Sequence, residues 1–563
     1  MTFLGKISLF RAYFFLVFTM PIAGCSKKEE AKPANLPPTV QLSGKLTKTS
    51  PITFEFFANA ADQEFDPLTY AWDFGNGTKT EGKERVSSTY EESKTYTIKV
   101  TVSDGKSNPT VTELRISTEA STITLDASKK FQTIEGFGGF GGQDVYWSNG
   151  PFTSDRFVND VVNDLGCTII RDEMPTAFEI ENDNNDPNVT DLSKFNLSRN
   201  IDGHHAPFNA RLPHFKAMKA AGVEKFIVSV WSPAPWMKWN NRIDNGTKEN
   251  AAPAYNKSPT VASNQLKTEN YEEFAESCAA YCKIFKREVG VDLYGFSIQN
   301  EPRFSQSYQS CVYNGEAMRD VIKVVGARFK KDGIPTKLFL PEDVGWYDGA
   351  NGLVTPTLND PQARQYLGAV ATHGYAFDGI NAGKQDAQTW QNMYNWGSPY
   401  NLPLWMTETS GFKNTQAGAI EMASAMYTAM RFGNASAWIF WTLSTGTLDE
   451  YSLMNSTGQK SKRYYVSKQF YRYVRPGAVR VEINATEKDI LPLAFINNGV
   501  TTIVLINIGT ADKMVKINGA GQPSQYKVFR TSADDDCKSY GEVPASDVIF
   551  VPAQGMVTLY SGK

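Results

Sequence analysis

Two glutamates come directly after short apolar segments, where a carboxylate needs either a partner or a chemical task. Glu301 follows the apolar part of "LYGFSIQNEP" (residues 293 to 302), and Glu408 lies within "PLWMTETS" (residues 403 to 410). One carboxyl group of such a pair can donate a proton while the other attacks or stabilises a carbon centre. That division of labour is the chemistry of glycoside hydrolysis.

Other apolar segments of the same region also end in polar or aromatic side chains. A single glutamate at a strand end is often a structural ion pair, which is the alternative for either residue taken alone. The repetition along the chain favours a shared site instead. The residues concerned are Arg171, Trp231, Asn300, Glu342, His373 and Tyr375.

Eight apolar segments alternate with helical segments that end at glycines, which predicts a (β/α)8 TIM barrel over residues 131–465. In such a barrel the substrate binds at the carboxyl ends of the strands, and strands four and seven face one another across the mouth. Glu301 and Glu408 would end those two strands. The eight predicted strands are 134–141, 167–175, 225–233, 293–302, 337–344, 369–375, 403–410 and 436–443.

The composition indicates several globular domains that are rich in aromatic side chains. The chain has 563 residues, more than one hydrophobic core usually organises, and 41% of them are hydrophobic. Its 57 Lys and Arg and 60 Asp and Glu give a net charge of −3, so nucleic acid is not an expected partner. Tryptophans suit the CH-rich faces of sugar rings. The candidate platforms are Trp147, Trp231, Trp236, Trp239, Trp346 and Trp441.

The N-terminus has the pattern of an export signal. Lys6 and Arg11 precede the apolar residues 12–23, which are too few to span a bilayer as a helix. The segment ends in "IAGC", which resembles a bacterial lipobox with Cys25 as the acylated residue; an ordinary secretory signal is the alternative. We therefore expect residues 1–25 to be a lipoprotein signal peptide and lipobox, 26–36 a polar tether, and the location the outer membrane surface.

The remaining cysteines do not form a metal-binding pattern. Cys278 and Cys282 lie four residues apart in a helical segment, where a disulfide between them would be strained. Neither the cysteines nor the four histidines have the spacing of a zinc site, so we expect buried structural thiols, at least one of them free because their number is odd, no catalytic metal and no cofactor. The other cysteines are Cys167, Cys311 and Cys537, and the histidines are His204, His205, His214 and His373.

Residues 37–118 predict a β-sandwich. "TYTIKVTVSDG" (residues 95 to 105) alternates apolar and polar side chains, as in a half-buried strand. Together with "LTYAWDFGNG", which places Trp72 and Phe74 beside turn residues, it resembles the polycystic kidney disease (PKD) domain, an immunoglobulin-like sandwich. The resemblance implies a spacer and says little about function.

The tail is strand-rich and predicts a second sandwich, packed against the barrel. Residues 466–563 contain several alternating segments, and residues 119–130 are expected to join them. An independent carbohydrate-binding module is the alternative, but the link "RPGAVRV" is short and apolar, which disfavours a free tether.

Five motifs carry a resemblance to a known enzyme family over residues 120–563. "SIQNEP" and "LWMTETSG" resemble the two catalytic strands of glycoside hydrolase clan A, and "EGFGGFGG", "SVWSPAPWMKWN" and "YYVSKQFYRYVRPGAVRV" are similar to segments of family 30. The resemblance implies hydrolysis with retention, without cofactor. It implies Glu301 as acid/base, Glu408 as nucleophile, Asn300 at the sugar 2-hydroxyl, Arg171 beside the nucleophile, His373 and Tyr375 around it, and Trp231 and Trp441 bordering the subsite.

The opening "GGFGGQDVYW", which contains Trp147, together with "WSPAPWMK", resembles the xylanase branch of the family. Glucuronoxylan-specific members hold the glucuronate with an Arg and a Tyr after the eighth strand. Here that loop (residues 442–460) offers Tyr451, but its first basic residue is Lys460, and it carries Asp449 and Glu450. We therefore predict a monomeric endo-β-1,4-xylanase that does not depend on glucuronate. A β-1,6-glucanase, another family 30 β-glycosidase and a non-catalytic surface glycan-binding lipoprotein remain alternatives.

Overall fold

A computed structural model describes residues 34–49, 51–141, 155–176, 178–199, 206–245, 264–346, 350–376 and 379–563. Cys25 and Trp147 therefore lie outside the described residues. The chain divides into two compact units. The second consists mainly of residues Thr118–Lys563. Within the described ranges, no helix is long and apolar enough to cross a membrane.

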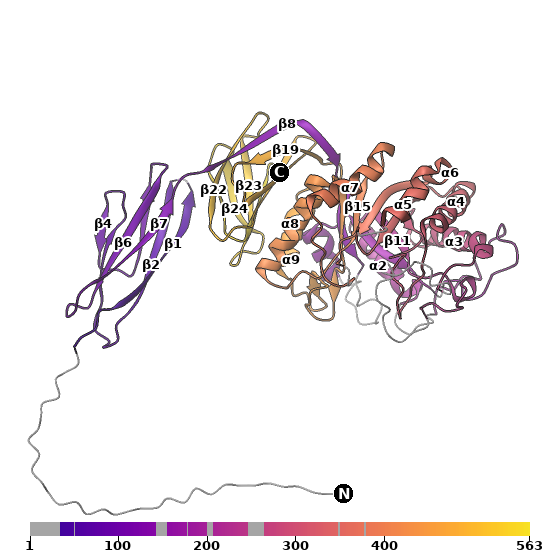
Figure 1. Cartoon of the computed structure of the whole chain (residues 1–563), viewed down its shortest axis with the longest axis horizontal. Coiled ribbons are helices and arrows are strands. Elements are labelled where there is room, and N and C mark those ends of the chain that lie inside the picture. Colours follow the sequence, from indigo (N-terminus) through magenta and orange to yellow (C-terminus); the bar gives the residue numbers. More distant parts are fainter. Residues whose placement is uncertain are drawn as a thin grey trace, which may run out of the picture. The chain divides into compact units, whose positions relative to one another are not determined.

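The first unit is a β-sandwich of two antiparallel sheets (Figure 1). Burial alternates along β6, where Tyr96, Ile98, Val100 and Val102 are buried as the sequence pattern predicts, and Trp72 lies in the same core. One sheet contains β1 (Thr39–Thr49), β2 (Ile52–Ala61) and β5 (Arg85–Tyr90), and the other β3 (Thr69–Asp73), β4 (Lys79–Glu81), β6 (Thr95–Ser103) and β7 (Thr110–Ser117).

The second unit contains a closed barrel of eight parallel strands that follow one another in chain order. This confirms the predicted TIM barrel. No barrel strand extends more than two residues beyond the segment predicted for it. The strands are β9 (Gly136–Phe140), β10 (Ile169–Met174), β11 (Lys225–Val230), β12 (Gly295–Ser297), β13 (Lys337–Asp343), β14 (Leu367–His373), β15 (Leu404–Glu408) and β16 (Ala435–Phe440).

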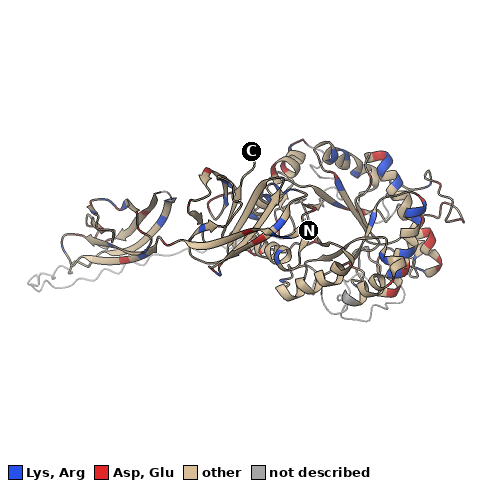
Figure 2. Ribbon diagram, turned by 90° about the horizontal axis from the view of Figure 1, so that it is seen from above, with Lys and Arg blue, Asp and Glu red and all other residues tan. Residues whose placement is uncertain are grey.

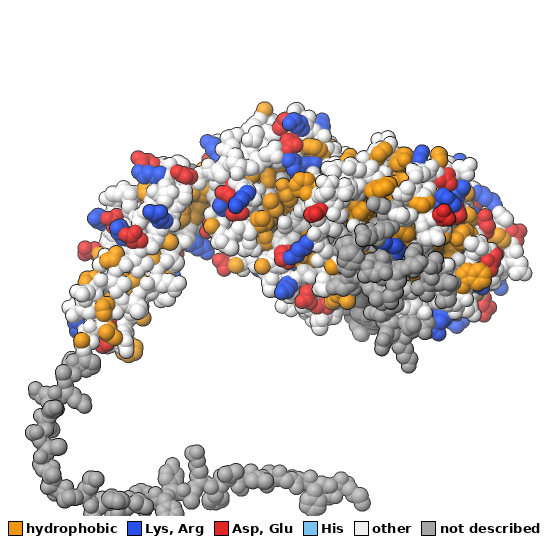
Figure 3. All heavy atoms as spheres, viewed as in Figure 1, with side chains coloured by type: hydrophobic (Ala, Val, Ile, Leu, Met, Phe, Trp, Pro, Cys, Tyr) orange, Lys and Arg blue, Asp and Glu red, His pale blue; other side chains and the backbone are white. Residues whose placement is uncertain are grey.

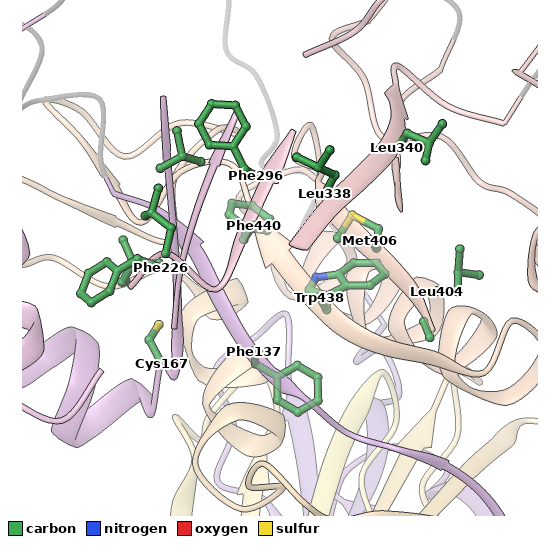
Figure 4. Packing of buried hydrophobic residues seen from close by; sticks show 14 of the residues in the cluster. Phe137, Cys167, Phe226, Phe296, Leu338, Leu340, Leu404, Met406, Trp438 and Phe440 are labelled. Atoms are coloured by element: carbon green, nitrogen blue, oxygen red, sulfur yellow. The ribbon is translucent and has the colours of Figure 1, made fainter. Parts of the chain in front are cut away.

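Side chains alternate between the inside of the barrel and the layer beneath the helices. Ile169, Ile227 and Phe339 pack together inside the barrel, while their neighbours in the chain join the outer cluster. Figure 4 shows this outer cluster, to which Phe226, Leu338, Met406 and Phe440 contribute from four strands. The inward-facing rows continue toward the carboxyl ends of the strands, where polar residues replace the apolar ones.

The first barrel strand requires glycine for close packing, which explains the "EGFGGFGG" motif. A Cβ at Gly138 would lie 1.7 Å from the carbonyl oxygen of Ile169 on β10. No side chain fits there, because the two parallel strands approach one another at this point. The motif is therefore a packing requirement of β9.

Helices cover the outside of the barrel, and Figure 2 shows Lys, Arg, Asp and Glu along them. On the face in Figure 3, charges of both signs are interspersed. The helices are α1 (Asp155–Val158), the π-helix η2 (Asn159–Leu165), α2 (Phe208–Ala220), α3 (Tyr271–Val289), α4 (Gly315–Lys331), α5 (Ala350–Asn359), α6 (Pro361–Arg364), α7 (Ala387–Gly397), α8 (Gln416–Phe432) and α9 (Lys462–Tyr471), with single 3-10 turns at Pro235–Met237, Thr268–Asn270 and Ser398–Tyr400.

A nine-stranded sheet flanks the barrel, and β8 (Ser121–Thr133) lies within it as predicted, between β19 (Val479–Ala485) and β22 (Lys513–Asn518). The boundary predicted at residues 465 and 466 falls inside α9, because the Ser461 side chain caps that helix by accepting from the Tyr464 amide. The remaining strands are β20 (Ile490–Asn497), β21 (Val500–Asn507), β23 (Gln525–Thr531), β24 (Lys538–Pro544), β25 (Ile549–Val551) and β26 (Gly555–Tyr560); a short pair, β17 (Ser444–Thr445) and β18 (Met454–Asn455), follows the barrel.

Candidate active site

Arg171 organises the carboxyl end of the barrel. It lies on β10, one inward-facing position above Ile169, and is fully buried. Its Nη1 donates to Glu408 Oε2 at 2.5 Å, its Nη2 to Asn300 Oδ1 at 2.7 Å, and its Nε to Glu342 Oε1 at 2.9 Å. One guanidinium therefore fixes side chains from the ends of the fourth, fifth and seventh barrel strands.

His373 joins the two predicted catalytic glutamates. Its Nδ1 lies 3.1 Å from Glu301 Oε1 and 3.9 Å from Glu408 Oε1. A single oxygen from each glutamate and a ring nitrogen of His373 all lie within 4.8 Å of one another. Carboxyl groups that close suit direct attack on a sugar carbon, since a mechanism with a water between them needs a wider gap.

The backbone turns sharply at two of these carboxylates. The backbone angle φ is +48° at Glu301 and +55° at Glu342, values that residues other than glycine rarely adopt. The Glu301 amide donates to the Glu342 carbonyl oxygen at 2.9 Å, which joins the two turns. Such strained positions cost free energy and are retained where the surrounding structure fixes them, often at functional sites.

The electrostatic environment separates the glutamates into an acid and a carboxylate. Burial raises the pKa of Glu301 to about 7, and the nearby charge of Glu408 adds to the rise although His373 opposes it. Burial also disfavours the charge of Glu342, but Arg171 and His373 hold its pKa at about 2. Burial would lower the pKa of His373, yet the surrounding glutamates raise it to about 9. A protonated Glu301 balances the two cations against the two remaining carboxylates.

A cavity of about 290 Å³ opens above these groups. Aromatic rings form one wall, where the ring centroids of Phe140 and Trp441 are 4.2 Å apart and those of Trp231 and Trp441 are 6.1 Å apart. The Arg171 guanidinium lies 4.9 Å from the Trp231 ring centroid. The lining residues are Phe140, Glu173, Trp231, Asn300, Glu301, Tyr308, Tyr375, Gly379, Ile380, Glu408, Ser410, Trp441 and Tyr451.

Most of the predicted site residues meet at this cavity. Trp231, Asn300, Glu301, Tyr375, Glu408, Trp441 and Tyr451 line it, and Arg171 and His373 lie fully buried among them. The Tyr375 hydroxyl lies 3.3 Å from Ser410 Oγ. Among the other predicted platforms, Trp346 is buried, Trp236 donates to the Glu179 carbonyl oxygen, and Trp239 is 54% exposed. None of these three lines the cavity.

Sequence reasoning missed six residues of the cavity: Phe140, Glu173, Tyr308, Gly379, Ile380 and Ser410. Glu173 is the acidic residue two positions after Arg171 on β10, so inward-facing alternation along that strand could have found it. Tyr308 lies in the segment after β12, between barrel strands four and five, where no periodic pattern exists. Loop residues of this kind carry no signal in a single sequence.

Glu301, His373 and Glu408 also form a cluster of potential metal ligands. The charges around them do not suit a cation. Arg171 already bonds to Glu408, and the raised pKa of His373 keeps its ring positively charged at neutral pH. A metal ion would have to displace or deprotonate both.

Comparison with known proteins finds similarities for both units. The PKD domain family matches residues 35–129. The sandwich of the first unit is a PKD domain. Its match extends into the first part of β8, although β8 pairs with β19 and β22 in the flanking sheet.

Sequence relatives cover most of the remaining chain. Glucuronoxylanase XynC of Bacillus subtilis (strain 168) is 24% identical over 464 residues, which covers 78% of this chain and 91% of XynC. A Caenorhabditis elegans protein named as a glucosylceramidase is 25% identical over 446 residues, covering 69% of this chain and 76% of its own.

Solved structures share the fold of the second unit. A GH30 endoxylanase from Clostridium papyrosolvens C71 superposes with a TM-score of 0.61 at 23% identity, covering 79% of this chain and 100% of that one. An endo-β-1,6-glucanase superposes with a TM-score of 0.58 at 20% identity. The match covers 80% of this chain and 96% of the glucanase chain. The homologues and structural neighbours of this chain are glycoside hydrolases. They include endo-acting xylanases and glucanases.

Proposed function

We propose that this protein is a family 30 endo-β-glycoside hydrolase that cleaves its polysaccharide with retention of configuration. The observation that carries the proposal is the geometry of Glu301 and Glu408, whose oxygens lie within 4.8 Å of one another beneath an aromatic-walled cavity. Burial raises the pKa of Glu301 to about 7, which suits a proton donor, and Arg171 bonds to Glu408.

In the first step, Glu408 attacks the anomeric carbon and forms a glycosyl-enzyme ester. Glu301 donates its proton to the leaving oxygen, so that the glycosidic bond breaks without release of an alkoxide. In the second step, Glu301 takes a proton from water, and this water cleaves the ester at the same face. Configuration is retained because two inversions occur.

Three neighbouring groups assist these steps. Arg171 orients the Glu408 carboxylate, and Asn300, fixed by the same guanidinium, is placed to bind the sugar 2-hydroxyl. A hydrogen bond to that hydroxyl strengthens as charge develops in the transition state. His373 bonds to Glu301 and stabilises the carboxylate that remains after proton transfer.

The charges around the cavity favour a neutral xylan backbone as the substrate. Glutamates are the only Asp, Glu, Lys, Arg or His residues among the described residues that line it: Glu173, Glu301 and Glu408. Three cationic side chains from the segments around the site form ion pairs or hydrogen bonds with other residues. Lys460 pairs with Asp160 at 2.9 Å and Arg303 with Asp343 at 2.7 Å, while Lys238 is buried and donates to Ser232 and Ser310.

A substrate panel tests the proposal. We expect release of reducing sugar from linear β-1,4-xylan and neutral arabinoxylan, with a mixture of oligosaccharide lengths, and a kcat/KM no higher on glucuronoxylan. Glu408→Gln serves as the control and should be inactive throughout. Activity on β-1,6-glucan alone would overturn the xylan assignment, and binding without any release of reducing ends would support a glycan-binding protein instead.

We propose, from the sequence pattern, that the mature protein is a lipoprotein anchored through Cys25 at the outer membrane surface. Wild-type protein should then sediment with membranes, and Cys25→Ser should be soluble or remain unprocessed. Wild-type protein that is freely soluble after signal cleavage would contradict the lipid anchor.

A further inference from the structure

The segment that begins at Glu301 is buried almost throughout and exposes a single aromatic ring. Within residues 301–313, Tyr308 is 44% exposed, Ser307 is half-buried and all the others are buried. Tyr308 also lines the catalytic cavity. A large ring that remains exposed at a sugar-binding cavity is a candidate contact for the substrate, because its burial on binding is favourable.

Buried hydrogen bonds fix the turn that carries Tyr308. Ser310 Oγ accepts from the Gln306 amide at 2.9 Å, which closes the turn. The same hydroxyl oxygen accepts from Asn264 Nδ2 at 3.0 Å, and the Ser310 carbonyl oxygen accepts from Lys238 Nζ at 2.7 Å. Lys238 is fully buried. The ring is therefore held in place before a sugar binds, so little conformational entropy is lost on binding.

The same segment supports a neighbouring part of the cavity wall. The Phe304 side chain packs with Val344 and Tyr375, which follow β13 and β14. A Cβ at Gly379 would lie 2.8 Å from the Phe304 ring, so the Gly379 backbone lies against that ring. The next residue, Ile380, is 47% exposed and lines the cavity. The loops after the fourth and sixth barrel strands therefore give the cavity an exposed apolar rim, which consists of Tyr308 and Ile380.

The opposite wall of the cavity is deeper and comes from other strands. Trp231 is 7% exposed and Phe140 is buried, and Trp441 packs against both. These rings belong to the ends of the first, third and eighth barrel strands. Arg171, which bonds to Asn300 and to the nucleophile, lies against this wall. The deep wall therefore surrounds the sugar that becomes attached to the enzyme.

We propose that Tyr308 is the platform of the leaving-group subsite, which binds the sugar released in the first step. The inference rests on the proposed function. Glu301 donates its proton to the oxygen of the departing sugar, so that sugar must lie beside Glu301 and the segment that follows it. Its CH-rich face would pack on the Tyr308 ring, with Ile380 at the border of the same subsite.

A subsite that holds the departing sugar also holds an incoming one. When a sugar hydroxyl takes the place of water in the second step, its oxygen attacks the anomeric carbon and the ester bond to Glu408 breaks. Glu301 takes the proton of that hydroxyl, and a new glycosidic bond forms with retained configuration. Tyr308 therefore favours transfer to sugar acceptors as well as cleavage.

The test compares two substrates that differ in the leaving group. One is the polysaccharide that the substrate panel shows to be cleaved. The other is β-xylobiosyl fluoride, or β-gentiobiosyl fluoride if the panel shows β-1,6-glucan, because fluoride occupies no sugar subsite. For Tyr308→Ala we expect kcat/KM to fall about tenfold to hundredfold on the polysaccharide and less than about threefold on the fluoride. With the free disaccharide added as acceptor, the ratio of transfer product to hydrolysis product should also fall.

Two further variants serve as controls. Tyr308→Phe restores the ring, so most of the lost kcat/KM on the polysaccharide should return. Trp239→Ala removes an exposed ring that does not line the cavity, and the ratio of the two kcat/KM values should stay as in wild type. Equal losses of Tyr308→Ala on the two substrates, or no loss on either, would overturn the inference and leave the proposed function intact. Wild-type protein that cleaves neither the panel nor the fluoride would overturn both.

Discussion

Two buried carboxylate groups lie in the same unit, and they differ in what balances their charge. At the barrel mouth, Arg171 and His373 face Glu301, Glu342 and Glu408. Beside α3, Glu179 and Glu276 are buried, and Arg328, which also bonds to Asp332, lies 3.8 Å from Glu276. At the mouth the pKa of Glu342 is about 2 and that of Glu301 about 7, whereas burial raises the pKa of Glu179 to about 8 and that of Glu276 to about 7.

The difference shows how a fold distinguishes an acid from a base. Burial raises the pKa of a carboxyl group, and a bonded cation lowers it. Glu342 bonds to Arg171 and has a low pKa, whereas burial prevails at Glu301 although His373 opposes it. The acid is therefore the buried carboxyl group that Arg171 does not reach.

Loss of the nucleophile should produce the largest effect. Glu408→Gln removes the atom that forms the glycosyl-enzyme, and kcat should fall on the order of 10⁴-fold or more. Glu301→Ala should still cleave aryl glycosides whose leaving group needs no proton, and azide should restore turnover with a β-glycosyl azide as product. An α-configured azide from Glu301→Ala would mean that the two roles are reversed.

Removal of the Arg171 guanidinium would leave the active-site carboxylates without one of the two cations that balance their charge. Arg171→Met leaves Glu342 and Glu408 buried without their charged partner, and the free energy of unfolding should fall by about 3–5 kcal/mol. Urea denaturation measures this loss. The matched control is Arg242→Met, which breaks a half-exposed pair with Asp244 and should cost about 1 kcal/mol or less. Equal losses in the two variants would contradict the organising role of Arg171.

The charge of His373 should be visible in the pH profile. Glu301 must be protonated to act as the acid, so kcat/KM should fall as pH rises through about 7. Because His373 lowers the pKa of Glu301, His373→Asn should move this alkaline limb upward by about one pH unit. Glu301→Gln, assayed on an activated aryl glycoside, should lose the limb entirely. A limb that moves downward in His373→Asn would show that its charge does not act on Glu301.

The smallest expected effect concerns the acidic lining of the cavity. Glu173→Gln removes one negative charge near the substrate, so the ratio of kcat/KM on glucuronoxylan to that on neutral arabinoxylan should rise about threefold to tenfold. Glu450→Gln, an exposed residue of the loop after β16, is the comparison and should change the ratio less. A ratio unchanged in both variants would show that the acidic lining does not select against charged branches.

The sequence predicted the fold well because the barrel strands have a strong local signal. The strands are short and mainly apolar, with β13, β14 and β15 ending in Asp343, His373 and Glu408, and glycines end several of the intervening helices. The predicted start of the flanking sheet at residue 466 falls inside α9 (Lys462–Tyr471), which begins after the Ser461 cap.

The site was predictable only in part, since its geometry depends on contacts between distant segments. Strand-end positions indicated Glu301, Glu408, Arg171 and Asn300, but no local pattern distinguishes Trp346, which is buried, from Trp231, which lines the cavity. Glu179, Glu273 and Glu276, which are buried beside α3, escaped notice because they lie in an irregular segment or in an ordinary helix. Their burial is a property of packing, which spacing alone does not reveal.

Strand β8 has a consequence for how this protein is made. It leads directly into the first strand of the barrel, yet its partners β19 and β22 come after the whole barrel in the chain. During synthesis, β8 with Ile123 and Leu125 therefore has no partner strand until β19 and β22 have left the ribosome. A chain cut short before Val479 would carry an unpaired strand, which is a ready template for aggregation.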